Sequence, residues 1–460
     1  MISTTVRKAL QNRKVQGALA VVFWLLVWHA ASVAVASPLI LVSPLAALKT
    51  LCGLAVTAAF WQTVAATGAR ILAGFFGALA AGAVLAVAAA AVPVVRIALR
   101  PLMVTVKSIP VASFTILALL WLRSAAQLSV LVSFLMAVPM VYTNVLEGIL
   151  SAGQELVQMA RVFRLPAART ARYIYLPAVM PYLRAAVSVS FGLCWKSGVA
   201  AELIGITSGS VGEALYNAKL LFSTADLFAW TAVIVLLSFV CEKLSALALA
   251  KLQTALARTQ PHPLHAAGES LPGALRVKNV SKRFGATDVF DGYSLDVPAG
   301  ACVCLMAPSG RGKTTLANLL LGLEKPDAGA VEAPARIACA FQEDRLCPDL
   351  SAAGNVLLAS GAAPETVLRA LRETGLGGET LEKPASQLSG GQKRRAAVVR
   401  AMLAGGGAVL LDEPFKGLDE RARAETAAFV KANRNGRTLL CITHEESDAA
   451  LLGAEVVRLP

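Results

Sequence analysis

Long apolar runs with little charge fill the first 250 residues of this 460-residue chain. Alanine, valine, leucine and phenylalanine dominate up to about Ala250, whereas from about Leu275 onward the sequence reads as a soluble α/β domain. Hydrophobic residues make up 56% of the chain and charged residues only 16%, which is too apolar for an ordinary soluble protein. This division predicts membrane-spanning helices followed by a soluble domain.

Six apolar runs are candidates for membrane-spanning helices. They are Gly17–Ala36, Arg70–Val92, Ile109–Leu122, Gln127–Leu146, Ala186–Ile204 and Phe228–Leu249. The third run is the shortest and begins with an Ile-Pro pair. Segment Pro44–Trp61 is apolar on one face only, so we expect a helix on the outer surface there.

Lysine and arginine are unevenly distributed between the segments that join these runs. The segments assigned to the inside carry Arg96, Arg100, Lys107, Arg161, Arg164, Arg169, Arg172, Arg184, Lys243, Lys251 and Arg258, and those outside carry Lys49, Arg123 and Lys219. This positive-inside pattern predicts a multi-pass protein of the inner (plasma) membrane with its soluble domain in the cytoplasm. No nucleic-acid motif accompanies the net charge of +14, so we expect the lipid bilayer, and no nucleic acid, as a partner.

A glycine-rich loop in the soluble part has the pattern of a phosphate-binding loop. It reads Ala307-Pro308-Ser309-Gly310-Arg311-Gly312-Lys313-Thr314-Thr315 and lies between a strand-like run and a helical pattern. Such a loop offers backbone N–H groups and a helix dipole to phosphate. We expect Lys313 to reach the β- and γ-phosphates of ATP and Thr314 to ligate Mg²⁺. Ala307 stands where the pattern has its first glycine.

Two acidic residues end the apolar run at 408–411. We expect Asp412 to hold Mg²⁺ and Glu413 to polarise the attacking water as a general base. Adjacent acids at a strand end are common, so this pair gains its meaning from the other motifs.

The run Leu388-Ser389-Gly390-Gly391-Gln392 resembles the signature motif of ATP-binding-cassette (ABC) ATPases. The resemblance implies that Gln342 senses Mg²⁺, that Asp419 belongs to the D-loop and that His444 contacts the γ-phosphate. For His444 the alternative is a structural histidine after a strand. The resemblance also implies that Phe284 stacks on adenine, with a plain strand-end aromatic as the alternative. Lys416-Gly417 replaces the Ser-Ala that usually precedes the Leu-Asp of the D-loop.

A cytoplasmic loop resembles the coupling loop of binding-protein-dependent importer permeases. The spacing from Gln158 through Arg164 to the Ile-x-Leu-Pro at 174–177 agrees with that pattern. Gln158, Met159 and Arg164 stand where the pattern has Glu, Ala and Gly. The first 250 residues as a whole resemble permeases of the sulfonate/nitrate/taurine class. The alternative is a cytoplasmic loop that is merely basic.

Together these resemblances imply a multi-domain chain. An all-α transmembrane permease of about six helices would occupy 1–250, a linker 251–274, and an α/β P-loop ABC ATPase 275–460. The expected function is ATP-driven import of a small solute, anionic if it is of the sulfonate/nitrate/taurine kind, delivered by an extracytoplasmic solute-binding protein. An exporter and a membrane-bound nucleotide sensor are the alternatives.

One chain carries only half of the implied machinery. In this family ATP binds between the phosphate loop of one copy and the signature motif of another. This chain has one of each, so we expect a second copy of the chain, or a similar fusion, as a partner.

Lys196 lies in the fifth apolar run, and Glu202 follows it in the same run. A lysine near the bilayer centre costs about 2.5–3.5 kcal/mol on insertion scales, so it should face a cavity or a partner. Lys196 either lines a path for an anionic solute, forms a structural pair with Glu202, or extends its side chain (snorkels) toward the membrane surface.

Overall fold

The computed structural model describes residues 13–122, 124–264, 271–285, 287–306 and 311–459. The chain forms two compact units. The first, here called the helical unit, comprises Met1–Leu150 and Val179–Ala250. The second, here called the α/β unit, comprises Ser151–Ala178 and Lys251–Pro460.

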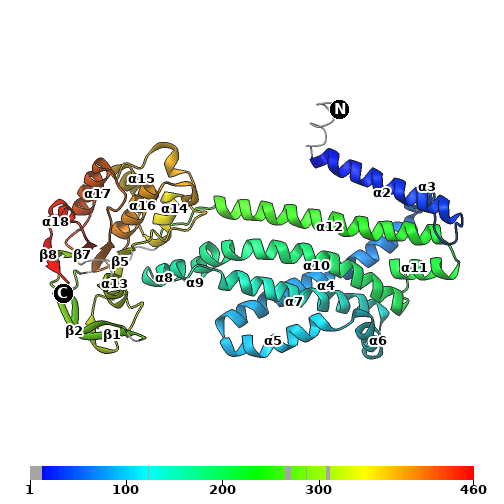
Figure 1. The fold of residues 1–460 in the computed structure, drawn as a ribbon, viewed down its shortest axis with the longest axis horizontal. Coiled ribbons are helices and arrows are strands. Elements are labelled where there is room, and N and C mark those ends of the chain that lie inside the picture. The colour runs from blue at the N-terminus through cyan, green and yellow to red at the C-terminus, as the bar shows by residue number, and fades with distance from the viewer. Residues whose placement is uncertain (1–12, 123, 265–270, 286, 307–310, 460) are drawn as a thin grey trace. The chain divides into compact units, whose positions relative to one another are not determined.

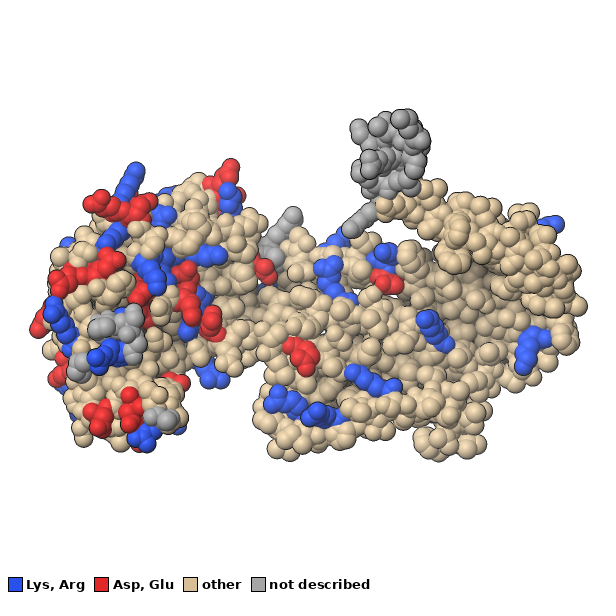
Figure 2. Space-filling model, in the orientation of Figure 1, with Lys and Arg blue, Asp and Glu red and all other residues tan. Residues whose placement is uncertain are grey.

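Long helices account for nearly all of the helical unit (Figure 1). They are α2 (Arg13–Val35), α3 (Pro44–Ala55), α4 (Ala58–Ala91), α5 (Pro93–Ser108), α6 (Val111–Trp121), α7 (Ala125–Leu150), α10 (Leu176–Gly205), α11 (Val211–Leu220) and α12 (Thr224–Arg258). Among the described residues, α2, α4, α7, α12 and the segment Ala167–Gly205 that contains α10 are long and apolar enough to cross a membrane. Figure 2 shows long uncharged stretches on this unit and charges of both signs on the α/β unit.

The predicted third span is wrong as a single helix. At Ile109–Leu122 the structure has the short helix α6, whose length is only about 16 Å at 1.5 Å per residue, half of a bilayer core. Helices α5 and α6 together pass the test for a span, but they are bent by 105° at a break before Val111. Pro110 explains the break, because proline disfavours helical backbone at the residue before it. In the part of the chain that the structure describes, the count of candidate spans is therefore five, or six if the bent pair is one span.

Small residues let the central helices of this unit approach closely. A Cβ added to Gly74 on α4 would lie 2.5 Å from the Val130 carbonyl oxygen of α7. A Cβ added to Gly198 on α10 would lie 2.6 Å from the Ser133 Oγ of α7. Close contact of this kind replaces the hydrophobic effect as the source of helix association in lipid.

The α/β unit is built on two sheets. An antiparallel sheet has the order β2-β1-β4, and a parallel sheet has the order β5-β6-β7-β3-β8. The strands are β1 (Leu275–Phe284), β2 (Thr287–Val297), β3 (Cys302–Met306), β4 (Ala328–Glu332), β5 (Ile337–Ala340), β6 (Ala408–Asp412), β7 (Thr438–Thr443) and β8 (Glu455–Arg458). Every residue of β5, β6 and β7 is buried, as expected for a parallel sheet that helices cover on both faces.

The helices of this unit follow the strands in the pattern of an α/β fold. They are α13 (Lys313–Leu320), α14 (Ala352–Ala359), α15 (Pro364–Glu373), α16 (Gly390–Leu403), α17 (Glu420–Ala432) and α18 (Glu446–Leu452). In a parallel sheet the carboxyl ends of the strands meet at one edge. The phosphate loop, the acidic pair and His444 follow β3, β6 and β7, so topology gathers the predicted site residues at that edge.

Two features depart from the expected domain limits. Helix α12 continues to Arg258, so the beginning of the predicted linker is helical. In addition, the predicted coupling loop at 151–178 is compact with the α/β unit rather than with the permease helices. It contains α8 (Gln154–Val162), α9 (Ala167–Thr170) and a π-helix (Ala171–Tyr175).

Candidate ATPase site

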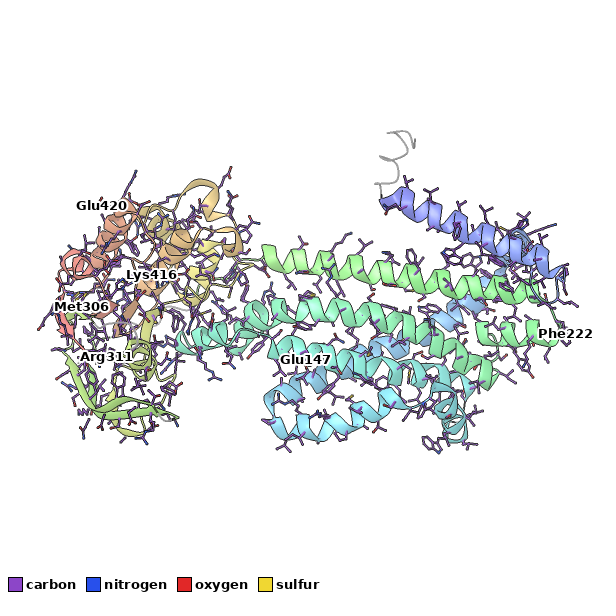
Figure 3. All side chains as sticks on the ribbon, in the orientation of Figure 1. Glu147, Phe222, Met306, Arg311, Lys416 and Glu420 are labelled. Atoms are coloured by element: carbon purple, nitrogen blue, oxygen red, sulfur yellow. The ribbon has the colours of Figure 1, made fainter. Side chains whose placement is uncertain are left out.

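Met306 ends β3 directly before the phosphate loop, and Arg311 lies within the loop, shortly before α13 (Figure 3). The predicted nucleotide-binding residues Ala307, Pro308, Ser309 and Gly310 lie outside the described residues. Gly312 has φ +81°, and a Cβ there would lie 2.7 Å from Val289 Cγ1. Both the conformation and the lack of space require glycine at this position.

Helix α13 begins at Lys313, directly after Gly312. Lys313 is half-buried, Thr314 is exposed and Thr315 is half-buried. The first turn of a helix leaves backbone N–H groups without intrahelical partners, and these groups favour anions. The helix start at Lys313 is therefore where the sequence predicts phosphate binding.

Asp412 ends the buried strand β6 and is 5% exposed. Burial raises the pKa of Asp412 to about 6, the neighbouring Glu413 adds to the rise, and Arg394 and Lys313 oppose it. A carboxylate that is costly to ionise without a cation suits Mg²⁺, which prefers oxygen ligands. The residues present therefore fit the expected metal.

Two side chains, those of Lys416 and His444, lie close to the Glu413 carboxylate. The backbone of Glu413 has φ +46°, and its N–H donates a 2.8 Å hydrogen bond to the Ile442 carbonyl oxygen of β7. Its Oε1 lies 3.5 Å from His444 Nδ1, and its Oε2 lies 2.9 Å from Lys416 Nζ. Partial burial raises the pKa of Glu413, but Lys416, His444 and Lys313 outweigh that effect, so the pKa lies below its ordinary value.

His444 follows β7 and its side chain is 54% exposed. The structure thus brings together Glu413 and His444, which are 31 positions apart in the sequence. An exposed imidazole beside the carboxylate is available to a third group such as a phosphate. The exposure of His444 therefore favours a contact with phosphate over the alternative of a purely structural histidine.

Gln342 is exposed just after β5. Two arginines of α16 hold this turn from beneath. Arg394 donates to the carbonyl oxygens of Phe341 and Gln342, and the buried Arg400 donates to the carbonyl oxygens of Asp344, at 2.9 Å, and Arg345, at 2.7 Å. Our sequence analysis did not identify either arginine. The sequence feature that could have identified them is a cluster of basic residues on a helix that is otherwise buried in the core. Arginine is rarely buried without partners, so such residues predict buried hydrogen bonds.

The signature residues open helix α16. Leu388 is buried, whereas Ser389 and Gly390 are exposed. Ser389 and Gln392 form a reciprocal capping box: the Gln392 N–H donates to Ser389 Oγ at 3.3 Å, and the Ser389 N–H donates to Gln392 Oε1 at 2.9 Å. The motif therefore presents a fixed, solvent-facing helix start.

The D-loop residue Asp419 caps α17, where its side chain accepts a 2.8 Å hydrogen bond from the Ala422 N–H. The loop before it touches the signature motif. A Cβ added to Gly391 would lie 3.2 Å from Leu418 Cδ2 and 3.3 Å from the Gly417 carbonyl oxygen. Glycine in the signature motif thus lets the two motifs lie against each other.

Phe284 ends β1 and is 47% exposed. Lys282 Nζ lies 5.1 Å from the centre of its ring. An exposed ring face is available to adenine, and the role of Phe284 remains a prediction.

The coupling-loop segment packs against the rest of the α/β unit through side-chain contacts. Met159, Ala160 and Phe163 belong to the core of that unit. Arg345 Nη1 donates a 2.9 Å hydrogen bond to Gln158 Oε1. Arg169 donates to the carbonyl oxygens of Leu358 and Pro263, at 3.3 and 3.1 Å.

Arg164 adopts φ +52° and donates to the Ala335 carbonyl oxygen. The coupling-loop pattern of importer permeases has glycine at this position. The backbone conformation explains this glycine, because a positive φ favours it. Arginine in place of glycine therefore keeps the conformation of the turn and adds a side-chain contact.

In the helical unit Glu202 does not pair with Lys196. Its Oε1 lies 2.8 Å from Arg70 Nε, and its Oε2 accepts a 2.8 Å hydrogen bond from the Thr67 hydroxyl. Glu202 is fully buried, whereas Lys196 lies on the exposed face of α10. The predicted structural pair of Lys196 with Glu202 is not formed.

Comparison with known proteins agrees with this arrangement. The family model described as ABC transporter matches residues 290–416, and the one described as binding-protein-dependent transport system inner membrane component matches residues 75–255. An aliphatic sulfonates import ATP-binding protein from Paraburkholderia xenovorans is 38% identical over 190 residues, covering 40% of this chain and 76% of that protein. One from Nocardia farcinica is 39% identical over 193 residues, covering 41% and 78%.

Among solved structures, a dimeric ATP-binding cassette in a post-hydrolysis state with ADP and phosphate is similar at 26% identity and a TM-score of 0.37. It covers 40% of this chain and 94% of that one. On the sequence relatives and the two family models, the chain belongs to the ABC transporter family, as a permease domain fused to an ATPase domain. The expected ATPase class and the fold class are confirmed.

Proposed function

We propose that this protein imports a small anionic solute across the inner membrane, driven by ATP and supplied by an extracytoplasmic solute-binding protein. The observation that carries the proposal is the match of residues 75–255 to the inner membrane component of binding-protein-dependent transport systems, on the same chain as the ATPase. Relatives of the ATPase part are described as aliphatic sulfonates import proteins, which favours a sulfonate-like solute.

Two copies, or this chain with a similar fusion, form the working transporter. Ser389 and Gly390 are exposed at the start of α16, where they can meet a nucleotide on another copy. Ser389 and Gly391 then contact the γ-phosphate of the ATP that Lys313 of the second copy holds. Each nucleotide thereby joins two α/β units.

Hydrolysis proceeds by attack of water on the γ-phosphorus of ATP, which breaks the bond between that phosphorus and the oxygen that bridges to the β-phosphate. The products are ADP, inorganic phosphate and a proton. Glu413 accepts a hydrogen bond from this water and polarises it, while His444 contacts the γ-phosphate. Lys313 stabilises the charge that develops on the phosphate oxygens. Thr314, Gln342 and Asp412 would hold Mg²⁺, which neutralises phosphate charge when bound.

Coupling passes through the segment at 151–178. Gln342 lies three residues before Arg345, whose guanidinium contacts Gln158 of α8. Closure of two α/β units around ATP moves this segment and, through it, the membrane helices. Hydrolysis resets them, which gives alternating access.

Lys196 lines the solute path. It lies on a face of α10 that its own chain leaves exposed, where a second copy or the solute path can meet it. A cationic side chain in the membrane attracts the sulfonate or carboxylate group of the solute.

The test is uptake into liposomes that contain the full chain, with ATP inside and a labelled sulfonate and its binding protein outside. Uptake that needs ATP and is abolished by Glu413→Gln supports the proposal. Lys196→Ala should weaken uptake of the anion, whereas Lys196→Arg should retain it. ATP-dependent efflux instead of uptake would show that the protein is an exporter.

A further inference from the structure

Lys416 stands where the resembling family has a serine, and its side chain reaches the proposed catalytic base. Lys416 Nζ lies 2.9 Å from Glu413 Oε2. The glutamate side chain is 9% exposed and the lysine side chain 57%. The contact is therefore an ion pair between a nearly buried carboxylate and a cation that water can also reach.

This ion pair opposes the action of Glu413 as a base. A carboxylate that polarises water needs an oxygen free to accept its hydrogen bond, and Lys416 lies against one of the two oxygens. His444 Nδ1 lies 3.5 Å from the other oxygen. The Lys416 side chain is 57% exposed, so water can solvate its ammonium group when the pair opens.

The loop that carries Lys416 is connected to the signature motif. The next residue, Gly417, has φ +73°, and its carbonyl oxygen and Leu418 Cδ2 lie against Gly391. A displacement of the signature motif therefore reaches Lys416 through two adjacent residues. Lys416 and Glu420 are both labelled on the α/β unit in Figure 3, and residues 417–419 lie between them in the sequence.

We propose that Lys416 is a positioning residue that holds Glu413 in a resting state until the signature motif engages nucleotide. The ion pair keeps the carboxylate away from the attacking water in the single chain. Movement of Gly391 and Leu418 on nucleotide binding displaces Lys416 and frees the carboxylate. This inference rests on the proposed role of Glu413 and names a regulation of that site.

The test is steady-state ATP hydrolysis by the full chain in liposomes, without binding protein or solute. Lys416→Ser, which restores the residue type of the family, should raise kcat about threefold, the size expected for an ion pair with one exposed partner. KM for ATP should not change, because the proposed role of Lys416 is to hold the catalytic base rather than to bind the nucleotide. Lys416→Gln should act like Lys416→Ser and guards against misfolding of one variant.

Three controls make the result specific. Lys416→Arg keeps the charge and should retain the low rate. Lys383→Ser breaks another ion pair in the same unit, to Glu379 at 3.1 Å, and should leave the rate unchanged. Lys416→Ser combined with Glu413→Gln should be inactive.

The outcomes separate the inference from the function on which it depends. If Glu413→Gln alone retains hydrolysis, the proposed role of Glu413 is wrong. Suppose instead that Glu413→Gln is inactive, while Lys416→Ser and Lys416→Gln fold but hydrolyse ATP no faster than the parent chain. Then the role of Glu413 stands and only the proposed role of Lys416 is wrong. An increase with Lys416→Arg equal to that with Lys416→Ser would also overturn it, since charge would then not matter.

Discussion

The Arg345 guanidinium donates a 2.9 Å hydrogen bond to the Gln158 side chain and thereby joins the turn after β5 to helix α8. Arg345 also stacks over the Phe341 ring, with its guanidinium carbon 4.0 Å from the ring centre. Arg400 stabilises this turn by donating a hydrogen bond to the Arg345 carbonyl oxygen. One residue thus connects the segment that follows Gln342 with the predicted coupling loop.

Replacing Arg345 by alanine should impair transport more than ATP hydrolysis. A hydrogen bond from a charged donor contributes about 1.5–3 kcal/mol, so losing it should weaken docking of α8 substantially. The measurement is the ratio of solute transported to ATP hydrolysed in liposomes. Arg369→Ala, on the exposed face of α15, is the control and should leave the ratio unchanged. An unchanged ratio in Arg345→Ala would mean that this contact does not transmit motion.

Position 164 allows backbone strain to be separated from side-chain contact. Arg164→Ala removes the contact with the Ala335 carbonyl oxygen and keeps the unfavourable φ, whereas Arg164→Gly removes both. Arg164→Gly should therefore be more stable than Arg164→Ala by about 1 kcal/mol. Thermal melting of the two variants measures the difference. Equal melting temperatures would show that the turn relaxes without cost.

Asp412 should make the stability of the magnesium-free protein depend on pH. Its pKa is raised to about 6 in the folded state, so its favourable contribution is present below pH 4 and is lost as the pH rises through 6. Above pH 6 the buried carboxylate costs about 3 kcal/mol. Asp412→Asn should therefore melt higher than the parent chain at pH 7.5 without Mg²⁺.

The advantage of Asp412→Asn should shrink as the pH falls from 7.5 to 5. Asp349→Asn, at an exposed position, is the matched control and should show no such trend. Melting in the presence of a chelator at the two pH values checks both expectations. A constant difference between parent and Asp412→Asn across this range would contradict them.

The ion pair of Arg70 with Glu202 should be costly to break from one side. Glu202→Leu leaves the partly buried guanidinium without its carboxylate, which costs about 3–5 kcal/mol in comparable buried pairs. The double variant Arg70→Leu with Glu202→Leu should recover much of this loss, because no unpaired charge remains. Melting in detergent of both single variants and the double variant measures the coupling. A double variant as unstable as the sum of the singles would refute it.

The local motifs of the site could be predicted because each is contiguous in the chain. Gly312 and Lys313, Ser389 to Gln392, and the acidic pair at the end of β6 occupy the places that their spacing indicates. Hydrophobic runs likewise identified the long membrane helices α2, α4, α7, α10 and α12. The short run at 109–122 misled the prediction, because hydropathy does not show that α6 is only 11 residues long and follows another helix at a bend of 105°.

By itself the sequence determined the class of the fold and the identity of the groups that can bind phosphate and metal, since these depend on short-range patterns of polarity and glycine. Only the tertiary structure decided which polar side chains meet. It paired Glu202 with Arg70 rather than Lys196, Gln158 with Arg345, and Glu413 with Lys416. Such pairs depend on how helices and strands distant in the chain pack, or on a turn whose backbone the packing imposes, and no local pattern encodes that geometry.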